Sequence, residues 1–541
     1  MKNSYSRRRA ALFLCLFALA GLAVFVSPSS SGQGRARVRE DIGRSLAGYD
    51  ELQLDPAAVA EEVRKDGRLT LATARGTFEL ELEPSDIRAA NYRAVVVEED
   101  GVAREIERTP SRTYKGTVRG LAGAQARFSI DEQKIEGLIV AGDEIYFVEP
   151  SKNFSPAAGA KDFVFYPESS VKAESFGECA TTLAQRVGER AAGVAPGGSA
   201  GSGGRAATTK GMTAELFGPK PEVEVATEAD AEYFVASGND ANAANNEILS
   251  IMNQVDGIYD AQLGIKMRIV FQRVWAVAPA SDPYTETNAR RALDQLRNVY
   301  DGSFAAGTLP ARDLTHMWTG KTLLDDDGDP GTIGIAYIAA VCDAPAFSYG
   351  ISQRAFASNN IRRVVLTAHE IGHNFSAEHP DEEEPVIDSC AGTIMNSTVT
   401  PSTNFCQFSL DQITDHVTVK DSCLTRLAQP GCTYAVAPAY KRFGIEGGAG
   451  TVNVSTSLPS CDWKVADGAP WLNITAGAAG VGPGVSTYSI APNTGGPLAT
   501  VVDIAGQKLK VVQDTSPNCA LVAFGEGNTS GVLAPSDCRS G

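Results

Sequence analysis

Positive charge is in short supply along this chain of 541 residues. Its 48 Lys and Arg residues face 65 Asp and Glu residues, which gives a net charge of −17 at pH 7. Nucleic acids and anionic membranes attract basic patches, and no basic stripe offsets the acidic balance. The composition therefore argues against binding to nucleic acid and against attachment to an acidic lipid surface.

Long apolar runs are also lacking, with one exception close to the N-terminus. Residues 10–26 are apolar, follow three arginines at 7–9 and precede a small polar stretch, which is the order of a cleavable signal peptide. An uncleaved anchor is the alternative, because the run is at the short limit for a membrane span, and the arginines also fit a twin-arginine signal. We expect a signal peptide over residues 1–32, a secreted, extracellular protein, and no membrane association once the signal has been removed.

Histidine is rarer still, and its distribution is uneven. Three of the five histidines fall between residues 369 and 379. His369 and His373 are four residues apart, so on a helix their imidazoles share one face and suit a single zinc ion. His379 is out of helical phase, so the chain has to leave the helix and fold back to deliver a third nitrogen. Three protein ligands leave a fourth position open for water, and Glu370 lies where it can take a proton from that water as general base.

The segment from His369 to His379 resembles the zinc motif of the metzincin metalloproteases, HExxHxxGxxH, which is followed by a methionine-containing turn beneath the metal. Met395 takes the place of that methionine. Ser376 stands where the family has a glycine with a left-handed backbone, at a cost on the order of 1 kcal/mol. The reprolysin (adamalysin) branch fits better than the astacins or serralysins, because those place a tyrosine soon after the methionine and residues 396–399 contain none. The resemblance implies a zinc endopeptidase that acts on extracellular protein or peptide substrates with one catalytic Zn²⁺.

The reprolysin resemblance covers about residues 223–427, and we expect a catalytic domain over residues 221–428. It implies an α/β (α+β) metzincin fold with a mixed sheet and a zinc-binding helix. Residues 331–342 resemble the edge strand of the family, along which an extended substrate adds antiparallel. Apolar periodicity agrees with such a fold and predicts helices over 242–262, 285–299 and 361–368 and strands over 265–277 and 314–318.

Short alternating strand patterns fill residues 69–150. Three of them, at 114–118, 128–129 and 146–150, occur in the order found in reprolysin-type propeptides, which this stretch resembles; an unrelated small β-domain is the alternative. We expect a β-rich propeptide over residues 33–192, followed by a Gly/Ser-rich linker at 193–211 that proteases can cut. The protein would then be made as a zymogen.

The number of cysteines available for pairing is odd. Ten cysteines, less Cys15 of the signal, leave nine, and disulfides are expected in a secreted protein. The expected disulfides are Cys342–Cys423 and Cys390–Cys406, which the resemblance implies, together with Cys432–Cys461 and Cys519–Cys538. Cys179 is left over. Because a thiolate is a good zinc ligand, Cys179 would either fill the open zinc position as a cysteine switch, as in relatives, or be an ordinary free thiol.

Residues 430–514 form a different module. Short alternating runs with turn residues at the appropriate spacing predict an Ig-like β-sandwich. The series resembles the BACON domain, a bacterial module appended to secreted proteases and glycosidases. The resemblance implies attachment to glycans or mucin, with a passive spacer as the alternative. The tail, residues 515–541, resembles the start of a further β-domain that is cut short.

Several alternatives stay open at the level of the sequence. Residues 325–329 resemble half of a calcium loop but lack an acidic residue at the twelfth position, so an acidic turn is the alternative to Ca²⁺ binding. His316 and His416 have no ligand-like partner at helical spacing and are expected to be structural or exposed. The alternative to a protease is a non-catalytic adhesin, in which the metzincin scaffold and the BACON domain bind glycans or matrix because Ser376 distorts the third ligand.

Overall fold

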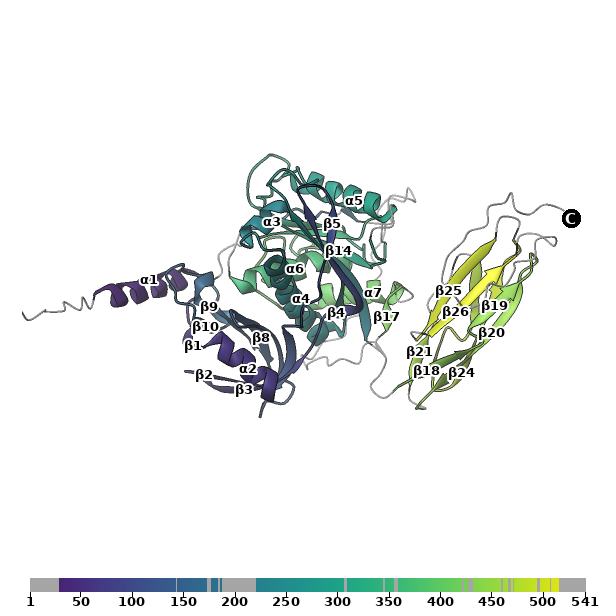
Figure 1. Ribbon diagram of the computed structural model, residues 1–541, viewed down its shortest axis with the longest axis horizontal. Helices are drawn as coiled ribbons and strands as arrows, with labels where there is room; N and C mark the ends of the chain where they lie inside the picture. The colour runs from purple at the N-terminus through teal and green to yellow at the C-terminus, as the bar shows by residue number, and fades with distance from the viewer. Residues whose placement is uncertain are drawn as a thin grey trace, which may run out of the picture.

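The computed structural model describes residues 29–514 apart from gaps at 143, 173–176, 183–184, 187–219, 306–308, 344–345, 355–358, 421–422, 427–431, 459–460, 466–468, 470, 494–496 and 506. Most of the expected signal peptide, the linker at 193–211 and the tail with Cys519 and Cys538 lie outside the described residues. Figure 1 shows a β-rich N-terminal part (residues 29–186), an α/β central part (220–426) and a C-terminal part made of strands (432–514). Among the described residues, no helix is long and apolar enough to cross a membrane.

The N-terminal part is built on an antiparallel sheet with the strand order β1-β10-β9-β8-β7-β6-β3-β2. Its strands alternate buried and exposed residues, as in β3, where Phe78, Leu80 and Leu82 are buried. Helix α2 packs Val59 and Val63 into the same apolar core. The elements are α1 (Ser29–Ser45), β1 (Asp50–Gln53), α2 (Pro56–Asp66), β2 (Arg68–Thr73), β3 (Gly76–Pro84), β6 (Thr113–Val118), β7 (Gln125–Ile130), β8 (Ile135–Ala141), β9 (Glu144–Pro150) and β10 (Asp162–Pro167).

The central part is built on a mixed sheet with the strand order β11-β15-β16-β14-β12-β13-β4-β5. Strand β15 is antiparallel to β16, whereas β16, β14, β12 and β13 are parallel to one another. Helices α4 and α6 share one apolar cluster with the sheet and α5 belongs to another, so the helices cover both faces. The elements are β12 (Pro221–Ala229), α3 (Ala231–Ala236), α4 (Ala241–Leu263), β13 (Lys266–Ala276), α5 (Ala289–Ala305), β14 (Leu314–Thr319), β15 (Thr332–Ala336), β16 (Tyr349–Gln353), α6 (Asn360–Asn374), α7 (Gln407–Val419) and β17 (Thr425–Arg426).

Both ends of the central sheet are supplied by the N-terminal part. Strand β4 (Arg88–Glu98) runs parallel to β13 and carries β5 (Ala103–Ile106) outside it, and β11 (Glu178–Cys179) runs parallel to β15 at the other end. The sequence placed all of residues 69–150 in one β-rich propeptide, whereas β4 and β5 join the central sheet. Periodicity identifies a strand and its buried face but does not identify the sheet that the strand joins.

Most elements predicted for the central part are confirmed, including the helix over 242–262 and the strands over 265–277 and 314–318. The helix predicted over 285–299 begins later, at Ala289. The amide of Thr285 donates to the side chain of Gln295 (2.9 Å) instead of entering the helix.

The strand predicted over 331–342 is shorter than expected and ends at Ala336. Beyond it, the amides of Ala339 and Ala340 donate to the carbonyls of His373 (2.9 Å) and Asn374 (2.8 Å) at the end of α6. The chain therefore leaves the sheet in order to bind the end of the helix, which ties the edge strand to the zinc motif.

The N-terminal part meets the central part through charged side chains that are almost fully buried. Arg127 on β7 donates hydrogen bonds to Asp256 (3.3 Å) and Asp260 (2.8 Å) on α4. Glu149 on β9 accepts the backbone amide of Asn360, the first residue of α6 (2.8 Å). Burial raises the pKa of Glu149 to about 7. The N-terminal part thus caps the helix that carries two of the motif histidines.

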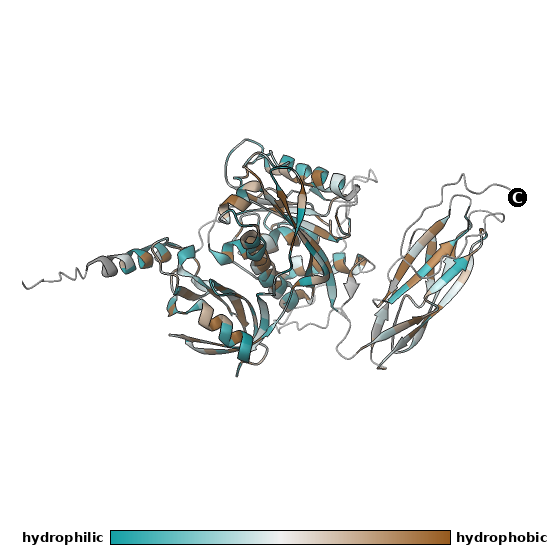
Figure 2. Ribbon diagram, viewed as in Figure 1, coloured by the Kyte–Doolittle hydropathy of each residue, from teal (hydrophilic) through white to brown (hydrophobic). Residues whose placement is uncertain are grey.

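The C-terminal part consists of two main sheets around one apolar core. One sheet has the order β18-β20-β24-β22 and the other β19-β26-β25, with a separate β21-β23 pair. Side chains of both sheets, such as Val452, Tyr488 and Val511, lie in one cluster, and in Figure 2 its strands carry alternating hydrophobic and hydrophilic residues. The strands are β18 (Tyr434–Ala437), β19 (Tyr440–Phe443), β20 (Gly448–Thr456), β21 (Asp462–Lys464), β22 (Leu472–Ala476), β23 (Ala479–Val481), β24 (Gly484–Ile490), β25 (Leu498–Ile504) and β26 (Gln507–Gln513).

The buried ion pairs of Arg127 should contribute to the affinity of the N-terminal part for the central part once the chain is cut between residues 187 and 219. We expect Arg127→Ala to weaken the association of the two cut parts by about 2 kcal/mol, because charge-assisted hydrogen bonds are lost while Lys266 still neutralises both carboxylates. The measurement is the dissociation constant of the cut chain, from analytical ultracentrifugation. Arg119→Ala is the control, because Arg119 pairs with Glu79 at an exposed site and such pairs contribute little. Equal losses in both variants would contradict the prediction.

Candidate active site

Helix α6 carries the first half of the zinc motif. The side chain of Asn359 caps its start by accepting the amide of Arg362 (3.4 Å), and its apolar residues over 361–368 are buried in the core. The helix ends at Asn374, and Ser376 then takes a left-handed backbone with φ of 82°. This residue turns the chain back, so that His379 returns to the buried end of the helix.

The three motif histidines converge through their Nε2 atoms. The Nε2–Nε2 distances are 3.1 Å for His369–His373, 3.0 Å for His373–His379 and 3.3 Å for His369–His379. The Nδ1 atoms lie against oxygen acceptors, which are the carbonyl of Ile394 for His369 (2.6 Å), the carbonyl of Ala377 for His373 (2.7 Å) and the carboxylate of Glu382 for His379 (3.1 Å). An Nδ1–H that donates to these oxygens leaves each Nε2 lone pair directed at one common point.

Burial favours the neutral forms of His369 and His373. Burial lowers the pKa of His369 to about 3 and holds the pKa of His373 well below its usual range. Neutral imidazole is the form that binds a metal, and three such nitrogens are the donor set of a catalytic zinc site. The residues present therefore fit a zinc ion.

Glu370 lies beside this point, completely buried against the edge strand. Its carboxylate fits there only because residue 334 is glycine, since a Cβ on Gly334 would lie 2.1 Å from Oε1. Among the described residues Oε1 has no hydrogen-bond partner, and burial raises the pKa of the carboxyl well above its usual range. The other carboxyl oxygen, Oε2, lies 3.5 Å from Sγ of Cys179, which is itself 3.5 Å from Nε2 of His373. This oxygen is therefore placed to bind a water molecule held at the imidazoles.

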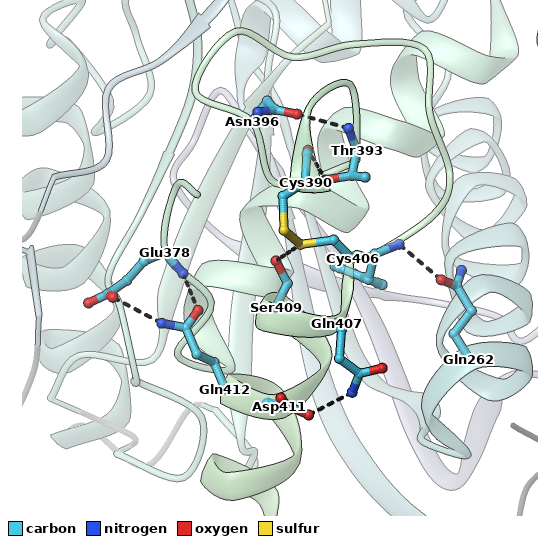
Figure 3. The surroundings of a disulfide bond; sticks show 11 residues. Gln262, Glu378, Cys390, Thr393, Asn396, Cys406, Gln407, Ser409, Asp411 and Gln412 are labelled. Carbon is cyan, nitrogen blue, oxygen red and sulfur yellow. Dashed lines mark hydrogen bonds between the residues drawn. A yellow bond between two sulfur atoms is a disulfide. The ribbon is translucent and has the colours of Figure 1, made fainter. Parts of the chain in front are cut away.

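Met395 packs against the helix of the zinc motif at Gly372. Its side chain is completely buried, and Sδ lies 2.5 Å from the position that a Cβ on Gly372 would take. The disulfide Cys390–Cys406 closes the loop that contains Met395, and Figure 3 shows Cys406 beside Ser409 near the start of α7. The turn is therefore fixed both to the helix of the motif and to the next helix.

Cys179 is brought into the same site. Its Sγ is 3.5 Å from Nε2 of His373 and 3.5 Å from Oε2 of Glu370. One donor atom from each of Cys179, His369, His373 and His379 lies within 4.8 Å of the others, and all four side chains are buried. Burial raises the pKa of the Cys179 thiol well above its usual range in the absence of a metal.

The backbone around Cys179 fills the space between the edge strand and the turn that follows Met395. The amide of Ala180 donates to the carbonyl of Gly334 (3.0 Å) on one side, and the amide of Cys179 donates to the carbonyl of Ser397 (2.9 Å) on the other. The segment runs parallel to β15. An extended substrate that added antiparallel to β15 would run in the opposite direction through the same space.

The other residues singled out in the sequence lie elsewhere. Three disulfides are formed as expected, Cys342–Cys423, Cys390–Cys406 and Cys432–Cys461. His316 is buried and contacts the hydroxyl of Ser352 (2.9 Å), and His416 lies against Phe375, so both are structural. In the acidic loop, the Asp325 carboxylate accepts the amides of Asp327 (3.0 Å) and Asp329 (2.8 Å), which is the geometry of a closed turn.

Sequence reasoning missed two residues of the site, Gly334 and Arg186. Gly334 has an ordinary strand conformation, so nothing local sets it apart from other strand glycines. Arg186 follows Cys179 and reaches the turn of the zinc motif, where it contacts Ser376 and Glu378. The sequence gives no sign of this contact, because Arg186 and Ser376 are 190 residues apart.

Comparison with known families agrees with this geometry. Residues 220–409 match the model of a reprolysin family described as metallo-peptidase family M12. The matched range contains the whole zinc motif and the Met395 turn. The match supports a reprolysin-like metalloprotease domain, a class that typically uses zinc and acts on proteins or peptides.

Gly334 should be essential for the position of the Glu370 carboxylate. Gly334→Ala is compatible with the strand backbone but forces the carboxylate to move, so we expect peptidase activity to fall by about 100-fold, a typical contribution of a positioned general base, while zinc is still bound. Activity, zinc content and a crystal structure of the variant test this. Gly331→Ala is the matched control on the same segment, since a Cβ there meets nothing within 4 Å. Full activity of Gly334→Ala would show that the close approach is unimportant.

Proposed function

We propose that this protein is a secreted zinc endopeptidase made as a zymogen, which hydrolyses peptide bonds in extracellular proteins. The convergence of three Nε2 atoms within 3.3 Å, with Glu370 beside them, is the observation that supports it most directly. His369, His373 and His379 would hold one Zn²⁺. The proposed organisation is a signal peptide (1–32), a propeptide (33–192), a linker (193–211), the catalytic domain (221–428), a BACON-like β-sandwich (430–514) and a tail (515–541).

The residues of the site have distinct roles in the proposed reaction. Zinc bound by the three imidazoles would supply the polarisation of the scissile carbonyl and of the attacking water. Glu370 accepts a proton from that water at a carboxyl oxygen and returns it to the leaving amine. The amides and carbonyls of the edge strand around Gly334 align the substrate backbone, because they are the groups that the segment around Cys179 occupies now.

Latency is explained by Cys179. A sulfur in the fourth zinc position excludes the catalytic water, and a backbone segment bound along β15 excludes the substrate. Cutting the linker would lower the effective concentration of this segment and allow it to leave. Both obstructions come from one short segment, so they would be removed together.

The adhesin alternative depended on Ser376 distorting the third ligand. Ser376 adopts the left-handed backbone that the turn requires, and His379 reaches His373 at 3.0 Å. This geometry gives no reason to prefer loss of catalysis. The C-terminal β-sandwich could still attach the enzyme to glycans or act as a spacer, and we assign it no further role.

Replacing Glu370 tests the proposed function. Glu370→Ala should keep one zinc ion per chain, because the ligands are unchanged. It should lose peptide hydrolysis by about 1000-fold, because the group that accepts the proton is removed. The measurements are zinc content and chelator-sensitive cleavage of casein by the activated chain. Glu383→Gln, in the loop after His379, is the control. A Glu370→Ala protein that cleaves casein as fast as the parent would rule out this mechanism.

Replacing Cys179 tests the latency. Cys179→Ser should give a precursor that is active, or that processes itself, without an added protease, because a hydroxyl is a poor zinc ligand. X-ray absorption on unprocessed Glu370→Ala protein should show one sulfur in the zinc shell at about 2.3 Å. A shell of nitrogen and oxygen alone would leave Cys179 as an ordinary buried thiol.

A further inference from the structure

The turn between the second and third motif histidines presents two oxygens to a cation. Nη1 of Arg186 donates to the hydroxyl of Ser376 (3.3 Å), and Nη2 donates to Oε1 of Glu378. The Arg186 and Glu378 side chains are 21% and 16% exposed. This is a partly desolvated guanidinium–carboxylate pair, in which hydrogen bonds are stronger than at an open surface.

Glu378 is held in place by the protein and not only by Arg186. Its Oε2 accepts a hydrogen bond from the side-chain amide of Gln412 on α7 (2.9 Å), and its own backbone amide donates to the same side chain (2.9 Å). Figure 3 shows this double contact between Glu378 and Gln412. One carboxylate oxygen is thus fixed, and the other is directed at the position of the guanidinium.

Ser376 adds a second contact to Arg186, although its left-handed backbone is strained. At φ of 82° a serine is less stable than glycine by on the order of 1 kcal/mol. A glycine would turn the chain equally well but would offer no hydroxyl. The serine therefore adds a polar contact at a position where the turn alone does not need one.

The Arg186–Glu378 pair lies close to the edge strand along which a substrate would bind. Arg186 lies beside Ile338, just beyond the end of β15, and the amide of Ile338 donates to the carbonyl of Gln185 (3.1 Å). Cys179, next to the zinc site, lies beside Gly334. A substrate antiparallel to this edge would have its N-terminal residues at Ile338 when its scissile bond is near Gly334. The offset of about four residues along an extended chain places the pair on the N-terminal side of that bond.

We propose that Ser376 and Glu378 form a subsite for a basic side chain of the substrate, arginine above lysine, within about four residues on the N-terminal side of the scissile bond. In the precursor Arg186 fills this subsite as a substitute for the substrate side chain. Arginine is preferred because its planar guanidinium reaches both oxygens at once, whereas an ammonium ion is a point charge. This inference rests on the proposed peptidase function and names the class of substrate.

The experiment uses the full chain after cleavage between residues 187 and 219. Fluorogenic peptides that differ only in Arg, Lys or Met at each of the four positions before the scissile bond are compared by kcat/KM. At one of these positions the parent should favour Arg over Met by at least about tenfold, the size of a charge-assisted hydrogen bond. Glu378→Gln should bring this Arg/Met ratio close to one. Glu383→Gln, which removes the same charge from the following loop, should leave the ratio as it is.

Two further arms keep the test decisive. Ser376→Gly suits the backbone at that position, so it should fold even if Glu378→Gln does not, and it should lower the Arg/Met ratio about threefold through loss of one hydrogen bond. Binding of the same peptides to the activated Glu370→Ala chain, followed by fluorescence anisotropy, should show the same preference without turnover. Failure of every peptide to be cleaved, with Arg peptides still bound best, would reject the proposed reaction and support the subsite. A ratio near one in the parent would overturn the subsite and assign the Arg186 contact to the precursor alone.

Discussion

Three imidazole nitrogens whose lone pairs face one point repel one another, and this chain holds them within 3.3 Å. The rest of the central part supplies the energy for that arrangement. Carbonyls of Ile394 and Ala377 orient two rings through Nδ1, the helix beneath them is buried along its whole length, and Met395 packs against Gly372. A metal ion placed at that point would replace this repulsion with attraction to all three nitrogens. The site is therefore prepared in advance for a cation.

The N-terminal part contacts both ends of the same helix. Glu149 accepts the amide at the first residue of α6 (2.8 Å), and Cys179 reaches His373 near its last turn (3.5 Å). Burial raises the pKa of Glu149 from 4.5 to about 7, so the packed state favours the protonated carboxyl. The stabilisation from this group is complete below pH 4.5 and is lost as the pH rises through about 7. Taken alone, this group favours packing of the N-terminal part on the helix in acid over packing at neutral and alkaline pH.

The sequence predicted the parts of the site that depend on local spacing. The interval between His369 and His373 fixes a shared helix face, and the two disulfides within the central part followed from the resemblance to the reprolysins. Contacts between distant segments could not be predicted in this way. Strand β4 lies in the sequence between β3 and β6 of the N-terminal sheet yet joins β13. The need for glycine at 334 arises only when Glu370 approaches it. The local sequence pattern predicts whether a segment forms a helix or a strand. Which other segment it packs against depends on the fold of the whole chain.

Ser376 illustrates how one departure from a family pattern can have two physical meanings. Judged by backbone energy alone it is a defect, because a left-handed serine is strained relative to glycine. Its hydroxyl, however, lies 3.3 Å from Nη1 of Arg186, beside a carboxylate that Gln412 holds in position. If the strain had no compensation, a glycine at this turn would be better in every respect. The hydroxyl of Ser376 and the Glu378 carboxylate, which Gln412 holds in place, contact one guanidinium. The serine thus provides a contact that the turn does not require and that the proposed subsite would use.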